Sequence, residues 1–168
     1  MQLRPAEPAD ALEVAGVHIR SWQVAYRGIF PDEYLDNLRP DERAERYTFG
    51  DPDPAQPTTV VAVAGGAIRG FATTGPARDD DAQPGGELFA IYVDPDHWGT
   101  GAGRMLMTDA RQRLAREGYR NAALWVLVDN QRAISFYQRD GWQPDGSRRI
   151  EHVWGVPADE VRYRRPLP

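Results

Sequence analysis

Cysteine is absent from the 168-residue chain. Without cysteine the protein can form neither disulfides nor thiolate metal sites, and no acyl group can pass through an acyl-cysteine intermediate. The three histidines, His18, His97 and His152, are too scattered for a recognisable metal motif, so we expect no metal. A Gly-x-Ser-x-Gly motif is also missing and no histidine has an evident serine partner, which argues against a hydrolase.

Long apolar runs are missing as well. No segment approaches the roughly 20 apolar residues that cross a bilayer. The first residues lack the basic and then apolar pattern of a leader peptide, so we expect a cytoplasmic protein without a membrane partner. The 25 acidic and 20 basic residues give a formal charge of -5. This charge argues weakly against a nucleic-acid partner and would suit a cationic acceptor, although modest acidity also simply favours solubility.

What remains is the composition of an ordinary globular chain, with 41% apolar and 27% charged residues. No repeat or linker divides it, so we expect one domain over residues 1–168. The expected strands are 1–4, 58–64, 68–74, 87–93, 122–128, 142–147 and 161–165, and the expected helices are 8–26, 32–35, 41–47, 103–117 and 130–139. The acidic run Asp79–Asp81 indicates a solvated loop rather than a metal cluster.

A glycine-rich turn lies between a predicted strand and a predicted helix, at Gly99–Gly103. Glycines let phosphate oxygens approach the main chain, and the first N–H groups of a helix attract anions, so the turn predicts a diphosphate site. A dinucleotide fingerprint starting at Gly99 would need a third glycine where Arg104 stands, and a triphosphate-binding Gly-Lys-Ser/Thr is absent. A plain strand-to-helix turn remains the simpler alternative.

The helix after Asn130 gives independent support. Asn130 and Tyr137 are nearly two helical turns apart and share one face, about 10 Å apart along the axis. The small Ala133 between them leaves room for a narrow ligand along that face. Helix capping by Asn130 and core packing by Tyr137 are the alternatives for each residue taken alone.

Together these segments resemble the Gcn5-related N-acetyltransferases. The resemblance depends on the ranges 87–95, 98–106 and 130–142, and the order of elements agrees along the chain. It implies an α/β fold with a mixed α+β sheet and flanking helices. The fourth and fifth strands of that sheet would splay apart and hold acetyl-coenzyme A as cosubstrate. The family usually has Gln or Arg where this chain has Trp98, so a main-chain contact is expected there.

The resemblance also implies which residues bind the cofactor. The main chain of Ile91, Tyr92 and Val93 would contact the acetyl and pantetheine groups, and Asn130 would bind pantetheine. The expected diphosphate contacts are Trp98, Gly99, Thr100, Gly101, Ala102, Gly103 and Arg104.

For catalysis, the resemblance makes Tyr137 the acid that protonates the departing thiolate, and a tyrosine pKa of about 10 is comparable to that of an alkyl thiol. The leading base is Glu87, which strand alternation would place on one face with Phe89, Ile91 and Val93. An ordered water, or a purely structural Glu87, is the alternative, because the base that some relatives carry on the fifth strand is replaced here by Trp125.

The acceptor would be a small amine or a peptide or protein amine. The candidate walls of its site are four aromatic residues, Trp22, Tyr26, Tyr34 and Trp154, although all four could equally belong to the core. The alternative to direct transfer in a ternary complex is a catalytically idle acyl-coenzyme A sensor, which the retained Tyr137 argues against. A homodimer is expected only because dimers are common in the family.

Overall fold

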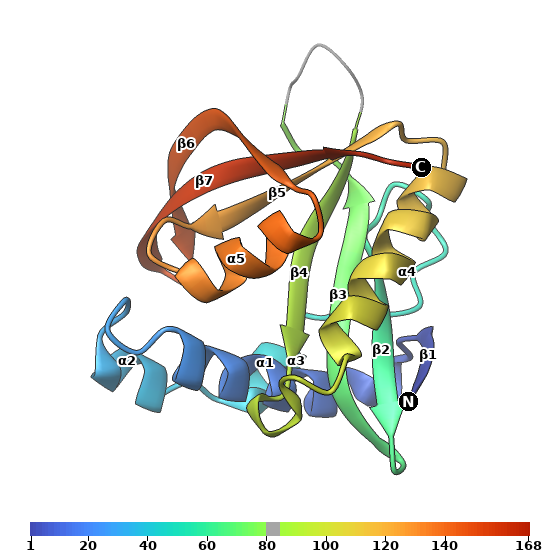
Figure 1. Cartoon of the computed structure of the whole chain (residues 1–168). Coiled ribbons are helices and arrows are strands. Elements are labelled where there is room, and N and C mark those ends of the chain that lie inside the picture. Colours follow the sequence, from blue (N-terminus) through green and yellow to red (C-terminus); the bar gives the residue numbers. More distant parts are fainter. Residues whose placement is uncertain (80–84) are drawn as a thin grey trace.

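The computed structural model describes residues 1–79 and 85–168. A seven-stranded sheet has the order β1-β2-β3-β4-β5-β7-β6, and β4 and β5 form its parallel pair. This mixed sheet with flanking helices confirms the predicted fold class (Figure 1). Asp80 and Asp81 of the predicted acidic loop lie outside the described residues. The strands are β1 Gln2–Pro5, β2 Thr58–Ala64, β3 Ala67–Pro76, β4 Gly86–Val93, β5 Asn121–Leu127, β6 Gln143–Val153 and β7 Val156–Pro166.

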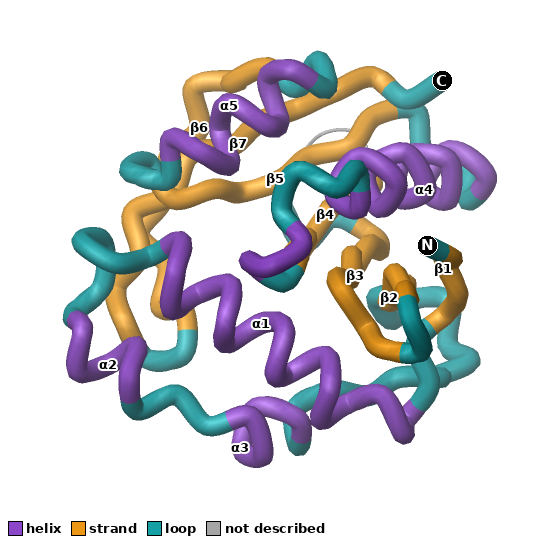
Figure 2. Tube along the Cα trace, turned by 60° about the horizontal axis from the view of Figure 1, so that its bottom comes forward, coloured by secondary structure: helices purple, strands orange, loops and turns teal. Residues whose placement is uncertain are grey.

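Two long helices cover opposite faces of the β2–β4 half of the sheet. Helix α4 packs on the face that carries Leu88 and Ala72, and α1 packs on the face that carries Phe71 and Val61. Figure 2 shows α1 crossing beneath the sheet, with α5 beside β5 and β7. No helix within the described residues is long and apolar enough to span a membrane. The helices are η1 Pro8–Asp10, α1 Ala11–Ala25, α2 Asp32–Asp36, α3 Pro40–Ala44, η2 Pro95–His97, α4 Ala102–Arg116 and α5 Gln131–Arg139.

Glycines end the two helices that flank β5, as their positions predict. Gly118 follows α4 with φ 93°, and Gly141 follows α5 with φ 89°. Only glycine adopts this left-handed conformation without strain. After Gly141, the Trp142 N–H donates to the Tyr137 carbonyl at 3.1 Å and the indole is buried. The glycine therefore returns the chain to the core directly beside Tyr137.

The central strands separate soon after they meet. β4 and β5 pair only through Gly86 with Ala122 and Glu87 with Ala123, and they then diverge (Figure 1). The predicted splay is confirmed. From Leu88 to Val93, one edge of β4 has no neighbouring strand, so its main-chain N–H and C=O groups are open to a ligand.

A β-bulge in β4 makes one sequence prediction wrong. Thr74 pairs with Leu88 but Thr73 pairs with Ala90, so Phe89 has no partner on β3. The extra residue shifts the side-chain alternation by one. Glu87 therefore shares a face with Ala90 and Tyr92, on the α1 side. It does not share the α4-facing surface of Ile91 and Val93 that strict alternation predicted.

The last hairpin is longer than the sequence indicates. The predicted strands 142–147 and 161–165 are parts of two eleven-residue strands, β6 and β7, joined by a two-residue turn. Pro144, Pro157 and many charged residues lower the β propensity of these segments and hide their alternation. Cross-strand ion pairs such as Arg149 with Glu160, at 2.9 Å, support the hairpin that propensity alone did not predict.

Candidate active site

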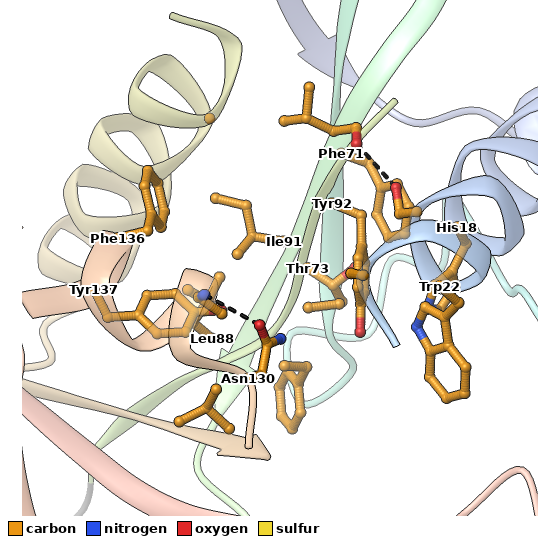
Figure 3. Close-up of a pocket in the computed structure, with 18 of the residues that line it drawn as sticks. His18, Trp22, Phe71, Thr73, Leu88, Ile91, Tyr92, Asn130, Phe136 and Tyr137 are labelled. Carbon is orange, nitrogen blue, oxygen red and sulfur yellow. Dashed lines mark hydrogen bonds between the residues drawn. The ribbon is translucent and has the colours of Figure 1, made fainter. Parts of the chain in front are cut away.

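A cavity of about 1830 Å³ runs along the open edge of β4. Small-molecule sites usually measure roughly 300–1,000 Å³, so this cavity can hold two ligands together. One wall, which we call the α4–α5 side, is built from the turn before α4 and from α5. The opposite wall, the α1 side, is built from α1, α3 and the β6–β7 hairpin. Figure 3 shows Phe136 and Tyr137 facing His18 and Trp22 across the cavity, with Ile91 and Tyr92 between them.

The open β4 edge meets the α4–α5 side at Val93. Its carbonyl accepts hydrogen bonds from the Ser21 hydroxyl at 2.9 Å and from the Trp98 indole N–H at 2.8 Å. Because peptide groups alternate along a strand, Ile91 presents its main chain to the same open edge. Tyr92 presents its main chain to β3 instead. Of the three predicted main-chain contacts, Ile91 and Val93 therefore face the cavity and Tyr92 faces away.

The glycine-rich turn has the backbone of an anion site. Gly99 and Gly101 have φ of 79° and 93°, and a Cβ at either position would meet no atom within 4 Å. Gly101 caps α4, and the first backbone hydrogen bond runs from the Met105 N–H to the Gly101 carbonyl. In the described part of the chain, the N–H groups of residues 102–104 have no backbone acceptor. These groups and the helix dipole favour a phosphate.

Three predicted contacts in this segment differ in how they reach the cavity. The Ala102 side chain is buried in the core, so only its main chain can contribute. The Trp98 indole donates to Val93 and lies beneath the Arg132 guanidinium, 3.6 Å from the ring centroid. The Thr100 hydroxyl donates to the His97 carbonyl at 2.7 Å. The polar side-chain groups of Trp98 and Thr100 thus already have partners within the protein.

Helix α5 places its predicted residues on the cavity. Asn130 caps the helix, and its Oδ1 accepts from the Ala133 N–H at 3.2 Å, so the capping alternative is correct as local structure (Figure 3). Capping uses only the oxygen, and among the described residues the Asn130 amide nitrogen has no partner. Asn130, Ala133 and Tyr137 all line the cavity, as their shared helical face predicts.

Tyr137 is nine-tenths buried and lies close to the splay of β4 and β5. Burial, with a smaller effect from Tyr92, raises its pKa well above the ordinary value of 10.0. The phenol therefore stays protonated at neutral pH. Its hydroxyl has no hydrogen-bond partner within the described part of the chain, so it is free to serve a ligand.

Glu87 lies outside the cavity wall, in a closed ion pair. Its side chain is 2% exposed and accepts from the Arg78 guanidinium at 2.7 Å and from the Arg78 N–H at 3.0 Å. These contacts fix the loop that follows β3. Its predicted role as base is untested, but the geometry gives Glu87 a structural task.

The α1 side is aromatic. Trp22 and Tyr26, which were predicted as acceptor walls, both line the cavity. Each is also packed in the hydrophobic core, so the wall and core predictions are both correct for these residues. The hydroxyls of Tyr26 and Tyr92 lie 3.2 Å apart. Tyr92 therefore contributes its side chain to the α1 side, a role that the sequence analysis missed.

Further residues on this wall also escaped sequence reasoning. His18 is buried and bonds the Tyr47 hydroxyl through Nδ1 at 2.8 Å. Glu160 of β7 lines the cavity, and Arg43 enters it from α3. Trp154, which was predicted as a wall residue, does line the cavity from the β6–β7 turn, whereas Tyr34 does not line it.

A diphosphate-type turn, an open strand edge and a protonated tyrosine, arranged along one cleft between splayed strands, define an acyl-transfer site of the coenzyme A type. The model of the acetyltransferase (GNAT) family matches residues 19–142. The chain therefore belongs to this family, and it is an N-acetyltransferase.

Relatives and solved structures agree with this assignment. The uncharacterized N-acetyltransferase YuaI of Bacillus subtilis is 34% identical over 136 residues, which cover 81% of this chain and 76% of YuaI. The mycothiol acetyltransferase of Thermobifida fusca is 30% identical and is covered over only 48% of its length. A structure of yncA from Salmonella typhimurium with acetyl-CoA is similar in fold, with a TM-score of 0.73 at 21% identity over 100% of this chain and 94% of that one.

Proposed function

We propose that the α4–α5 side holds acetyl-coenzyme A. Its diphosphate would accept hydrogen bonds from the N–H groups at Gly103 and Arg104. The pantetheine arm would follow the open main chain of Ile91 and Val93 past the Asn130 amide, and the sulfur would end near the Tyr137 hydroxyl. The observation that supports this most is the single cavity that joins the α4 N-terminus to Tyr137.

The acceptor amine would enter from the α1 side and attack the thioester carbonyl directly. The nitrogen forms a bond to the acetyl carbon, the carbon–sulfur bond breaks, and Tyr137 donates its proton to the departing thiolate. A protonated phenol in this position suits general acid catalysis. The absence of cysteine removes an acyl-cysteine route, which supports direct transfer.

The amine must lose a proton before it can attack. Among the described carboxylates, Glu160 is better placed than Glu87, because it lines the cavity and acts electrostatically on Tyr26 and Tyr92. We propose that the proton leaves through the hydroxyls of Tyr26 and Tyr92 toward Glu160. The ion pair with Arg149 holds that carboxylate in place.

The test is consumption of acetyl-coenzyme A across a panel of amines, with free thiol release and product mass as readouts. We expect thiol release that depends on the amine and equals the acetylated product formed. If isothermal titration shows acetyl-coenzyme A binding but no amine is acetylated, the acyl-coenzyme A sensor is correct and direct transfer is excluded.

A further inference from the structure

Arg43 is a cation without a carboxylate partner on the wall of the acceptor cavity. Across the described residues, no Asp or Glu forms an ion pair with it, and its buried Nε has no hydrogen-bond partner. Three other arginines that line the cavity do have carboxylate partners, since Arg78 pairs with Glu87, Arg111 with Asp140 and Arg149 with Glu160. A buried guanidinium N–H that lacks an acceptor is costly unless a ligand supplies one.

The aromatic surroundings hold the Arg43 guanidinium in a fixed place. It lies 4.3 Å from the Trp154 ring centroid and 5.1 Å from that of Tyr47. Trp154 in turn stacks on Trp22 at 4.1 Å with an interplanar angle of 16°. Contacts with aromatic rings orient a guanidinium without using its N–H groups. The Arg43 guanidinium is therefore held in place beside Tyr47 and Trp154, and no carboxylate of the described residues neutralises its charge.

The turn that carries Trp154 is strained. Trp154 has φ 51° and Gly155 has φ 82°, the pair of positive values that a two-residue hairpin turn requires. Asn or Gly adopts this conformation far more easily than a bulky residue. A backbone outlier of this kind points to a functional constraint. Here the strained position places the Trp154 indole between Trp22 and Arg43, where it forms part of the α1 side and supports the guanidinium.

A continuous wall links this cation to the reacting end of the cavity. Arg43 contacts Trp154, the Trp154 ring lies 4.8 Å from that of His18, and His18 lies 4.4 Å from Tyr92. The Tyr92 hydroxyl is 3.2 Å from that of Tyr26. Electrostatically, Tyr92 is affected by Glu160 and by Arg43. The α1 side of the cavity thus has the Glu160 carboxylate near its reacting end and the Arg43 cation farther along.

We infer that the acceptor is a small amino acid, a primary amine that also carries a carboxylate. The carboxylate binds the guanidinium of Arg43, with the exposed Arg46 adding charge at the same mouth. Two parallel N–H···O bonds between a guanidinium and a carboxylate are strong and directional. The amine then lies toward Glu160 and the thioester. This inference rests on the proposed acetyl transfer and adds the class of acceptor.

The experiment compares each amino acid with the amine left after its carboxylate is removed. Phenylalanine is paired with phenethylamine and with phenylalaninamide, and β-alanine and γ-aminobutyrate are paired with ethylamine and propylamine. The readout is kcat/KM for acetylation. We expect the acid of at least one pair to exceed its partner by about tenfold or more, the size of one charge-assisted hydrogen bond.

Variants assign the preference to Arg43. Arg43→Gln should lower the ratio of kcat/KM for the acid to that for its decarboxylated partner by about tenfold, while Arg43→Lys should keep part of the advantage of the acid. Arg116→Gln, on the exposed surface of α4, makes the same charge change outside the cavity and should alter neither value. Titration of the acid into coenzyme A-loaded enzyme should show the same Arg43 dependence without any turnover.

The outcomes separate this inference from the proposed function. If the amines that lack a carboxylate, or phenylalaninamide, match or exceed the amino acids, acetyl transfer stands and the amino acid acceptor is wrong. The inference is also wrong if Arg43→Gln leaves the preference unchanged. If no amine is acetylated at all, the proposed function fails and the inference fails with it.

Discussion

The two walls of the cavity are built in different ways. The α4–α5 side uses main-chain groups and short-range geometry, with glycines at positive φ, a helix N-terminus and one helical face. The α1 side uses large side chains brought together from α1, α3 and the β6–β7 hairpin. A main-chain site suits a ligand that is constant across a family, whereas a side-chain site can be altered one residue at a time. We therefore expect substitutions on one wall to spare the ligand of the other.

Tyr137→Phe should have the largest effect. Loss of the acid should lower kcat by about 100-fold, while the dissociation constant of acetyl-coenzyme A changes less than about twofold, because ring packing remains. Stopped-flow thiol release and isothermal titration measure the two values. An unchanged kcat would remove Tyr137 from the mechanism.

Gly101→Val should act on the cofactor alone. A β-branched residue at φ 93° is strained, and its side chain would fill the open space through which a phosphate approaches the main chain, so affinity for acetyl-coenzyme A should fall by about thirtyfold. Gly66→Val is the matched control, since Gly66 has φ 76° and open space around it in the β2–β3 turn. Both variants should lose similar free energy of unfolding, and equal losses of affinity would show that the turn is not the anion site.

Glu160→Gln and Glu87→Gln separate the two candidate bases. Glu160→Gln should lower kcat/KM for the amine by about tenfold near neutral pH. Glu87→Gln should change it by less than about threefold but lower the free energy of unfolding by about 1–2 kcal/mol, because the Arg78 contacts weaken. The reverse pattern would restore Glu87 as the base.

His18→Asn should have the smallest effect, on the pH dependence of stability. Burial and the nearby Arg43 lower the pKa of His18, so below about pH 6.5 the unfolded chain binds the extra proton. Wild-type stability should therefore fall with pH in this range by up to about 1.4 kcal/mol per pH unit from this residue. His18→Asn should flatten that part of the curve, and exposed His152→Asn should not. Denaturant unfolding from pH 7 down to pH 5 provides the comparison.

The sequence predicts the α4–α5 side better than the α1 side, because the first is built from local patterns and the second from segments far apart in the chain. The turn at Gly99–Gly103 and the face shared by Asn130 and Tyr137 are local patterns, and both lie where periodicity put them. Glu87 was misplaced because one bulge at Phe89 reverses strand alternation, and no residue type announces a bulge. Arg43 and Trp154 are more than 100 residues apart in sequence, so only the tertiary fold brings the cation to the indole.

The central claim is that coenzyme A binds along the α4–α5 side and leaves the α1 side to the acceptor. A crystal structure with bound coenzyme A tests this claim most directly. We predict diphosphate oxygens within hydrogen-bond distance of the main-chain nitrogens of Gly103 and Arg104. The sulfur should lie within reach of the Tyr137 hydroxyl, and the α1 side should remain free. A diphosphate bound away from the α4 N-terminus, or a pantetheine arm lying along Trp22 and Trp154, would contradict it.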